Sequence, residues 1–240
     1  MNWKLLYVLS DPKRIPIYLY SIIYGEIRGL ISLRGKFFGM ITIPEAILLY
    51  KIANLLPSKS TILEIGCYGG LASSFILAGC KKNKSFLYSI DPFESDLYIQ
   101  KNIVSKYKNS YYRKVETESL NNKPSIEVVK NRLKKAGFVN FKLIEGYSHT
   151  VSKKWSKKIN FLWIDGNHEY ETVKEDFSDW SRFLTKGGYI AFHDANNESG
   201  SDTWRWGLDG PTRFSRKVLI EPNWTIVYKV DSILCAKKNF

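Results

Sequence analysis

The stretch TILEIGCYGG, residues 61–70, passes from an apolar run into a glycine-rich turn. The run LASSFILAGC, residues 71–80, follows at once and is typical of a helix. Glycine lets the backbone turn tightly and approach a ligand closely, just before the positive end of a helix. The pattern predicts a strand, a turn and a helix that together bind a nucleotide-type ligand, and a plain tight turn is the alternative.

Similar segments alternate along most of the chain. Apolar runs expected as strands follow at residues 85–93, 141–146, 159–166, 189–195, 224–230 and 232–238. Runs expected as further helices cover residues 42–56, 124–138, 169–188 and 211–220. Strands that alternate with helices predict an α/β fold with a largely parallel sheet and helices on both faces. A short turn at Asp231-Ser232 joins the last two strands, which predicts an antiparallel pair.

The bulk composition predicts a globular protein. The 240 residues suffice for one large domain, and 44% of them are hydrophobic. No apolar run approaches the roughly 20 residues that span a membrane, and no signal peptide is evident. The cysteines Cys67, Cys80 and Cys235 are scattered and odd in number, which suits neither a disulfide framework nor a zinc site. A cytoplasmic location is the simplest expectation.

The formal net charge of +13 raises the question of an anionic partner. Most of the excess lies in residues 101–160, which carry a net charge of +11. Lysine far outnumbers arginine, as a compositional bias alone would produce. A solvated basic face is therefore the favoured interpretation, while a phosphate-binding surface and a peripheral contact with an anionic membrane stay open.

Polar residues end several of the expected strands, at the edge where parallel sheets bind ligands. Asp91 ends the second strand, at a distance beyond the glycines from which a carboxylate can accept hydrogen bonds from both hydroxyls of a ribose. Asp165 ends the fourth strand, and His193-Asp194 ends the fifth. The glycines lack the Gly-x-Gly-x-x-Gly spacing of dinucleotide-binding proteins, so a dinucleotide is not the favoured ligand.

Four segments, in their order and spacing, carry a resemblance to a known family. They are LEIGCYGG (63–70), YSIDPF (88–93), LWIDGNHEYETVKEDFSDW (162–180) and GGYIAFHDA (187–195). The chain resembles class I S-adenosylmethionine-dependent methyltransferases, above all the small-molecule O-methyltransferase branch. That branch contains macrolide-sugar and aminocoumarin-sugar O-methyltransferases and cephalosporin-hydroxylase-like proteins, and catechol O-methyltransferase is a more distant relative.

The resemblance implies a Rossmann-like, mostly parallel sheet of seven strands in the order 3-2-1-4-5-7-6, with an antiparallel C-terminal pair. It covers residues 41–240, the expected S-adenosylmethionine-dependent methyltransferase domain. Residues 1–40 are expected to form an N-terminal helical extension. Residues 94–124 are polar, basic and rich in tyrosine, and they are expected to be an insertion or a lid.

The resemblance also implies a binding site for S-adenosylmethionine formed by residues at the ends of the first three strands. Glu64, Gly66 and Gly70 would line its methionine part. Asp91 would hold its ribose, and Tyr147 and Ser148 would lie near its adenine.

In this branch a divalent metal, usually magnesium, lies at the ends of strands four and five, which are neighbours about 4.8 Å apart in the implied order. Asp165 and Asp194 would converge on that Mg²⁺ or Mn²⁺ ion. His193 stands where the hydroxylase-like relatives have an acid, and it would be a softer third ligand that also tolerates zinc or iron. Ala195 replaces the asparagine that supplies a ligand in catechol O-methyltransferase.

His168, three residues after Asp165, would either complete the metal site or act as the general base. Asp165, His168 and His193 are the expected catalytic residues. The alternatives are caps of the following helix and loop for the two aspartates, and structural imidazoles for the two histidines. His149 is assigned to a structural role.

The expected reaction is methylation of a hydroxyl on a sugar or another small polar metabolite. The metal would hold two vicinal hydroxyls and lower the pKa of one, so that its oxygen attacks the sulfonium methyl group in line. Trp204, Arg205 and Trp206 lie in the long segment after Asp194, where indole faces could stack on a sugar and the guanidinium could pair with an anion. A packed surface loop is the alternative for this segment.

Two other functions stay open. An RNA methyltransferase would use the basic surface of residues 101–158, but the Asn/Asp-Pro-Pro-Tyr type of motif used for base amines is absent after the fourth strand. A methyltransferase-like binding module without catalysis would not need Glu64, Asp91, Asp165 and Asp194 to be intact. The expected partner is a small molecule rather than a nucleic acid, and a homo-oligomer stays open.

Overall fold

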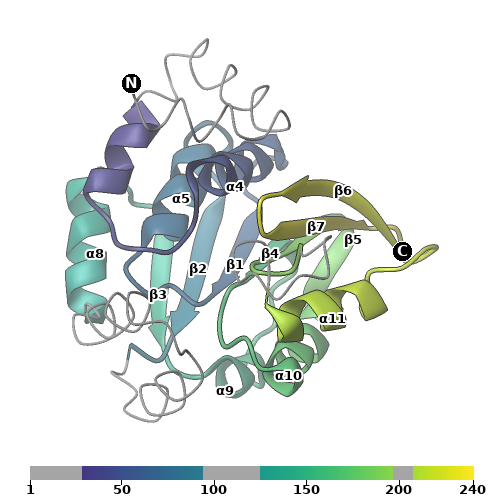
Figure 1. The fold of residues 1–240 in the computed structure, drawn as a ribbon. Helices are drawn as coiled ribbons and strands as arrows, with labels where there is room; N and C mark the ends of the chain where they lie inside the picture. Colours follow the sequence, from purple (N-terminus) through teal and green to yellow (C-terminus); the bar gives the residue numbers. More distant parts are fainter. Residues whose placement is uncertain (1–28, 94–124, 197–207) are drawn as a thin grey trace, which may run out of the picture.

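A computed structural model of the chain describes residues 29–93, 125–196 and 208–240. Over these residues the strands form one sheet in the order β3-β2-β1-β4-β5-β7-β6 (Figure 1). They are β1 (Thr61–Ile65), β2 (Phe86–Asp91), β3 (Phe141–Glu145), β4 (Ile159–Ile164), β5 (Leu184–Phe192), β6 (Trp224–Val230) and β7 (Ile233–Lys238). The first five are parallel, and β7 is antiparallel to both β5 and β6. The strand order and the antiparallel pair expected from the sequence are confirmed.

Helices cover both faces of this sheet (Figure 1). They are η2 (Ser32–Gly35), α4 (Ile43–Leu55), α5 (Leu71–Asn83), α8 (Ile126–Lys135), α9 (Ser148–Ser152), α10 (Tyr170–Trp180), η3 (Ser181–Phe183) and α11 (Asp209–Val218). One apolar core joins the sheet to α4, α5 and α8, and a second joins it to α10 and α11. Strand β4 supplies Phe161 and Trp163 to the first core and Leu162 and Ile164 to the second, because successive side chains of a strand point to opposite faces.

The boundary between α10 and β5 differs from the sequence prediction. The helix was expected to continue to Gly187-Gly188, but it ends at Trp180 and β5 begins at Leu184. Leu184 is buried and pairs with Ile159 of β4, and the register of this ladder shifts before Phe161. Gly187, with φ +74°, lies inside the strand near this irregularity. The two glycines therefore belong to a bent strand and do not end the helix.

Residues 29–40, the described part of the expected N-terminal extension, contact the rest of the described chain. Leu30, Leu33 and Phe37 are buried in the same core as α4 and α5. Phe38 forms an isolated parallel bridge with Gly70. The division of the chain at residue 40 stays a prediction, and the expected insertion at residues 94–124 lies outside the described residues.

Two expectations from composition can be compared with the described residues. All three cysteines are buried and none forms a disulfide. No helix in the described ranges has both the length and the apolar composition needed to cross a membrane.

Candidate active site

The turn between β1 and α5 requires glycine at two positions. Gly66 has φ +92° and Gly70 has φ +82°, a backbone conformation that other residues rarely adopt. A Cβ atom on Gly66 would lie 2.0 Å from the backbone oxygen of Asp165. The amide of Asp165 in turn donates a hydrogen bond of 2.9 Å to the carbonyl of Ile65. The glycine turn and the end of β4 are therefore packed backbone to backbone.

Asp91 lies at this turn, as the sequence predicted. It is 4% exposed, and its Oδ2 atom accepts a hydrogen bond of 2.7 Å from the amide of Tyr68. Its Oδ1 atom accepts one of 2.7 Å from the amide of Phe93. The carboxylate thus orders the glycine turn, and each carboxylate oxygen can accept more than one hydrogen bond. Its role toward a ribose stays a prediction.

Glu64 is fully buried under the glycine turn. Its Oε2 atom accepts hydrogen bonds from the hydroxyls of Ser73 and Ser89. Its Oε1 atom is buried with no hydrogen-bond partner among the described residues. Burial raises the pKa of Glu64 to about 8, against the lowering effect of the two serines. The side chain is therefore mostly protonated at pH 7.

We expect the Glu64→Gln variant to have a weaker dependence of stability on pH than the natural protein. Between pH 4.5 and about 8 the folded protein holds a proton on Glu64 that the unfolded chain has released. Its free energy of unfolding therefore falls as pH rises through this window, by roughly 1 kcal/mol per pH unit. Glutamine does not titrate, so this part of the slope disappears.

Urea unfolding of both proteins from pH 5 to pH 8 measures this difference. Burial also raises the pKa of Asp176, to about 7, so a slope from that residue stays in both proteins. Equal slopes in the two proteins would show that Glu64 is ionised in the fold.

The first turn of α9 holds the two residues expected near adenine. The Ser148 hydroxyl accepts a hydrogen bond of 2.8 Å from the Trp180 indole and so ties α9 to α10. Tyr147 is 48% exposed and stacks on His149 with 5.9 Å between ring centroids. The adenine contacts of Tyr147 and Ser148 and the structural role of His149 stay predictions.

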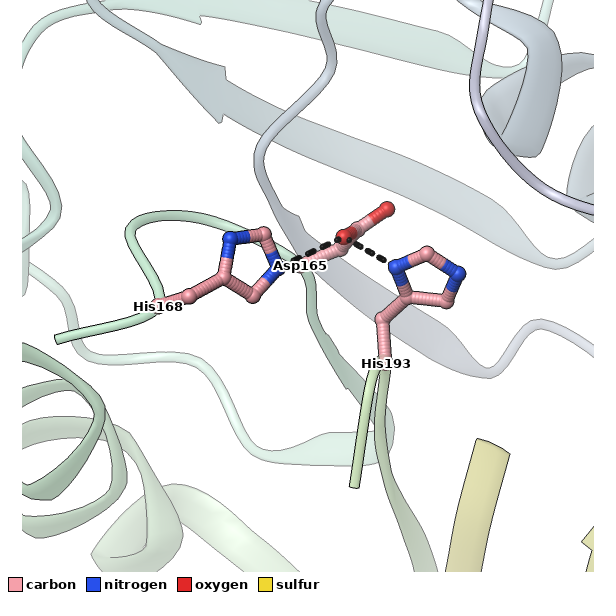
Figure 2. Close-up of side chains that lie close together, drawn as sticks. All are labelled: Asp165, His168 and His193. Atoms are coloured by element: carbon pink, nitrogen blue, oxygen red, sulfur yellow. Dashed lines mark ion pairs between the residues drawn. The ribbon is translucent and has the colours of Figure 1, made fainter. Parts of the chain in front are cut away.

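Four polar side chains meet where β4 and β5 end. Asp165 lies between the imidazole rings of His168 and His193 (Figure 2). Its Oδ1 atom is 2.9 Å from Nδ1 of His193 and 3.8 Å from Nε2 of His168. Oδ2 of Asp194 is 3.3 Å from Nε2 of His168 and 3.5 Å from Nδ1 of His193. The convergence that the sequence predicted at this edge is present.

The backbone of Asp194 is held in an unusual conformation. Its φ is +50°, in the left-handed region that costs a residue other than glycine roughly 1 kcal/mol or more. Its amide donates to the Ser232 hydroxyl over 3.2 Å, and its carbonyl accepts from the amide of Leu208 over 2.7 Å. The Thr212 hydroxyl also donates to this carbonyl over 3.3 Å. These contacts fix the direction of the Asp194 carboxylate toward the two imidazoles.

The donor set suits a divalent metal. Asp165, His168 and His193 each offer one ligand atom within 4.8 Å of the other two, and Asp194 adds a carboxylate oxygen beside both imidazoles. Neighbouring ligand atoms around an ion with bonds of about 2.1 Å lie about 3 Å apart. The contacts of 2.9–3.8 Å are close to this value. Two oxygens and two nitrogens suit Mn²⁺, Zn²⁺ or Fe²⁺ as well as Mg²⁺.

A family model described as a methyltransferase domain matches residues 63–195, which is more than half of the chain. The chain belongs to this methyltransferase family. The matched segment begins in β1, contains the glycine turn and Asp91, and ends just after His193-Asp194. The resemblance to class I S-adenosylmethionine-dependent methyltransferases is confirmed.

Three known proteins show the range of similar chains. Uncharacterized protein R132 of Acanthamoeba polyphaga mimivirus is 47% identical over 82 residues, and the match spans 34% of this chain and 34% of that protein. A second similar protein is the O-methyltransferase TomG from Streptomyces achromogenes, which is involved in tomaymycin synthesis and was solved in complex with S-adenosylmethionine. It is 16% identical with a TM-score of 0.54, and the match covers 84% of this chain and 82% of TomG. An rRNA methylase from Streptococcus thermophilus is 14% identical with a TM-score of 0.53. The match covers 84% of this chain and 100% of the methylase. The likeness to TomG and to the rRNA methylase, at 16% and 14% identity, shows a shared fold.

The two histidines of the cluster differ in their exposure to solvent. The side chain of His193 is 7% exposed, whereas that of His168 is 31% exposed and lies at the rim of the cluster. Nε2 of His168 has no hydrogen-bond partner among the described residues. Burial alone would lower the pKa of His193, but Asp165, Asp194 and Glu45 raise it well above the ordinary value. The three carboxylates around this buried imidazole therefore favour its protonated form.

The residue that sequence reasoning missed is Glu45, in the first turn of α4. It is 1% exposed, and its Oε2 atom lies 3.6 Å from Nε2 of His193. Burial raises the pKa of Glu45, but contacts with His193, Ser232 and Thr42 outweigh it and lower the pKa to about 2. The available signal was the Thr42-x-x-Glu45 spacing of a capping box, which explains the start of α4 but not the contact with His193.

The expected substrate residues Trp204, Arg205 and Trp206 lie outside the described residues. The helix α11 that follows them packs closely on the loop of His168. A Cβ atom on Gly210 would lie 2.0 Å from the backbone oxygen of His168. The position of that imidazole therefore depends on the start of α11.

Proposed function

We propose that this methyltransferase transfers the methyl group of S-adenosylmethionine to a hydroxyl of a sugar or another small polar metabolite, assisted by Mg²⁺ or Mn²⁺. The observation that carries the proposal is the convergence of Asp165, His168, His193 and Asp194 directly beside the glycine turn. Because the backbone of Gly66 touches that of Asp165, a cofactor over the turn and a metal at the cluster would be neighbours.

The residues around the turn fit S-adenosylmethionine. The buried Oε1 atom of Glu64 lacks a hydrogen-bond partner among the described residues, and a ligand ammonium group could supply one. The absence of a side chain at Gly66 lets the end of β4 pack against the turn, which brings the cluster next to the expected cofactor site. Asp91 would accept ribose hydroxyls while it orders the turn. When bound, S-adenosylmethionine supplies an electrophilic methyl group.

The residues of the cluster would have different roles in metal binding and proton transfer. Asp165, Asp194 and the buried His193 would hold the metal, which would bind the acceptor hydroxyl and lower its pKa. The side chain of His168 is 31% exposed, and it would take the hydroxyl proton on its buried Nε2 atom, which lies 3.3 Å from Oδ2 of Asp194. Catalysis by these residues would consist mainly of orientation and charge stabilisation.

We expect the Asp91→Ala variant to bind S-adenosylmethionine roughly 1–3 kcal/mol more weakly, because charge-assisted hydrogen bonds to the ribose are lost. Titration calorimetry with S-adenosylmethionine measures the change. Glu145→Ala is a matched control, because Glu145 pairs with Asp91 in the sheet register and its exposed carboxylate ends the neighbouring strand β3. Equal affinity in the Asp91 variant and the natural protein would remove the ribose assignment.

An RNA acceptor is the second candidate, and the exposed lysines of the described basic segment favour it. They lie on α8 and after α9 and include Lys134, Lys135, Lys153, Lys154, Lys157 and Lys158. An RNA acceptor would give an affinity that falls steeply with salt, with a slope set by the number of phosphate contacts. Methylation of small sugars with no salt-dependent RNA binding supports the first candidate, and the opposite result supports the second.

A further inference from the structure

Glu45 makes more contacts than the start of a helix needs. Its Oε2 atom accepts a hydrogen bond of 2.7 Å from the amide of Thr42, whose hydroxyl accepts from the amide of Glu45 over 3.3 Å. These two bonds complete the capping box of α4. The Oε1 atom accepts two further bonds from the turn between β6 and β7, of 2.8 Å from the amide of Ser232 and 2.6 Å from its hydroxyl. One buried carboxylate therefore joins α4 to that turn.

The same carboxylate lies against the ring of His193, on the side away from the cluster. Nε2 of the ring is 3.6 Å from Oε2 of Glu45, an ion-pair distance, and Nδ1 is 2.9 Å from Oδ1 of Asp165. Figure 2 shows the first of these nitrogens pointing away from Asp165 and the second pointing toward it. A ring turned by 180° would place carbon atoms against both carboxylates. The pair Glu45 and Asp165 therefore fixes which nitrogen faces the cluster.

Burial strengthens the electrostatic attraction between Glu45 and His193. The side chains of Glu45 and His193 are 1% and 7% exposed, so water screens their attraction little. The Ser232 hydroxyl, which donates a hydrogen bond to Glu45, also accepts one of 3.2 Å from the amide of Asp194. Glu45 thus contacts the imidazole of residue 193 directly and the backbone of residue 194 through one hydroxyl.

We propose that Glu45 is a positioning residue that keeps the Nε2–H of His193 turned toward α4, so that Nδ1 is presented to the metal. The inference rests on the proposed metal site. A carboxylate behind a metal-binding imidazole fixes the tautomer and orientation of the ring and raises the basicity of the ligating nitrogen. A metal at Nδ1 would leave the proton of this ring on Nε2, facing Glu45. Position 193 therefore acts as a carboxylate–imidazole ligand built from two distant segments of the chain.

The affinity for Mn²⁺, measured by the electron paramagnetic resonance signal of the free ion, tests this role. We expect Glu45→Gln to bind Mn²⁺ roughly 10–100-fold more weakly than the natural protein, the usual effect of losing such a partner. Thr42→Ala is the matched structural control. It removes the hydroxyl of the capping box and its bond to Asp231 but leaves the carboxylate beside His193. It should lower the melting temperature and change the Mn²⁺ affinity less than about twofold.

The His193→Gln background separates positioning from general damage to the fold. If Glu45 acts through His193, adding Glu45→Gln to His193→Gln produces no further loss of Mn²⁺ affinity. An equal loss in both backgrounds, or unchanged affinity in Glu45→Gln alone, would overturn the inference while leaving the metal site in place. No Mn²⁺ binding by the natural protein would instead remove the proposed metal site, and the inference with it.

A measurement on the natural protein covers the case in which Glu45→Gln does not fold. The ¹⁵N nuclear magnetic resonance spectrum of the Mg²⁺-bound protein reports which nitrogen of His193 carries a proton. We expect the proton on Nε2, facing Glu45. A proton on Nδ1 in the Mg²⁺-bound protein would overturn the inference.

Discussion

Replacement of Asp165 by asparagine should abolish methyl transfer while leaving the affinity for S-adenosylmethionine nearly unchanged. The Oδ1 atom of Asp165 is the contact that the two imidazoles share, at 2.9 Å and 3.8 Å. The asparagine side chain would keep the shape but lose the negative charge that a hard cation requires. We expect a loss in turnover of roughly 10²–10³-fold or more, with any acceptor that the natural protein methylates.

Calorimetry with S-adenosylmethionine, Mn²⁺ binding and release of S-adenosylhomocysteine together measure this effect. Asp209→Asn is a suitable control, because it removes the same charge from an exposed side chain at the start of α11. A chelator should act like the Asp165 variant, and Mg²⁺ or Mn²⁺ should restore activity. Full activity in chelator would contradict the role of the metal and leave His168 as a general base acting alone.

Replacement of Gly66 by alanine should damage both the cofactor site and the cluster at once. The added Cβ atom would lie 2.0 Å from the Asp165 oxygen and 3.0 Å from the Gly166 amide nitrogen, so the ends of β1 and β4 must separate. The positive φ adds backbone strain. We expect destabilisation of roughly 2–5 kcal/mol from overlap and strain together. S-adenosylmethionine and Mn²⁺ should both bind more weakly, because both sites use this junction.

Gly137→Ala separates the two causes of this loss. Gly137 also has a positive φ, of +83°, but a Cβ atom there would meet nothing within 4 Å. The Gly137→Ala variant should lose roughly 1 kcal/mol of unfolding free energy, which is the strain of the backbone alone. Its affinities for S-adenosylmethionine and Mn²⁺ should be unchanged. Urea unfolding and calorimetry on the two variants measure the difference. Equal losses of stability in both would mean that the contact between Gly66 and Asp165 carries no weight.

The sequence allowed the strands, most of the helices and the four side chains of the cluster to be predicted, because these depend on local patterns. Alternating apolar segments located the strands, and a residue that ends a parallel strand must lie at the ligand-binding edge of the sheet. Asp165 and Asp194 could therefore be found from their places in the chain. The order of the strands came from a resemblance to a family and not from periodicity.

Other features depend on contacts between distant segments. The side chain of Glu45 meets His193 only after α4 has packed near β7, and the capping box already accounts for a glutamate at that position. The burial of α4 likewise depends on segments that are distant in the sequence. Seven of its hydrophobic residues are buried, namely Ala46, Ile47, Leu48, Leu49, Tyr50, Ile52 and Ala53, because α5 and β6 both contact this helix (Figure 1).

The end of α10 was mistaken for a related reason. Glycine ends helices and also bends strands, and the choice between them depends on the neighbouring strand. Here the pairing of Leu184 with Ile159 decides it. The residues Trp204, Arg205 and Trp206 and the lid expected at residues 94–124 stay predictions.

In the proposed mechanism, a metal at Asp165 lies beside the methyl group of bound S-adenosylmethionine. S-adenosylmethionine labelled with ¹³C in the methyl group tests this directly, because bound Mn²⁺ broadens the signal of a nucleus only at short distance. We expect strong broadening of the methyl signal when Mn²⁺ is added to the complex with the natural protein, and none with Asp165→Asn. Tight binding of both S-adenosylmethionine and Mn²⁺ without broadening would place the two sites apart and contradict the account.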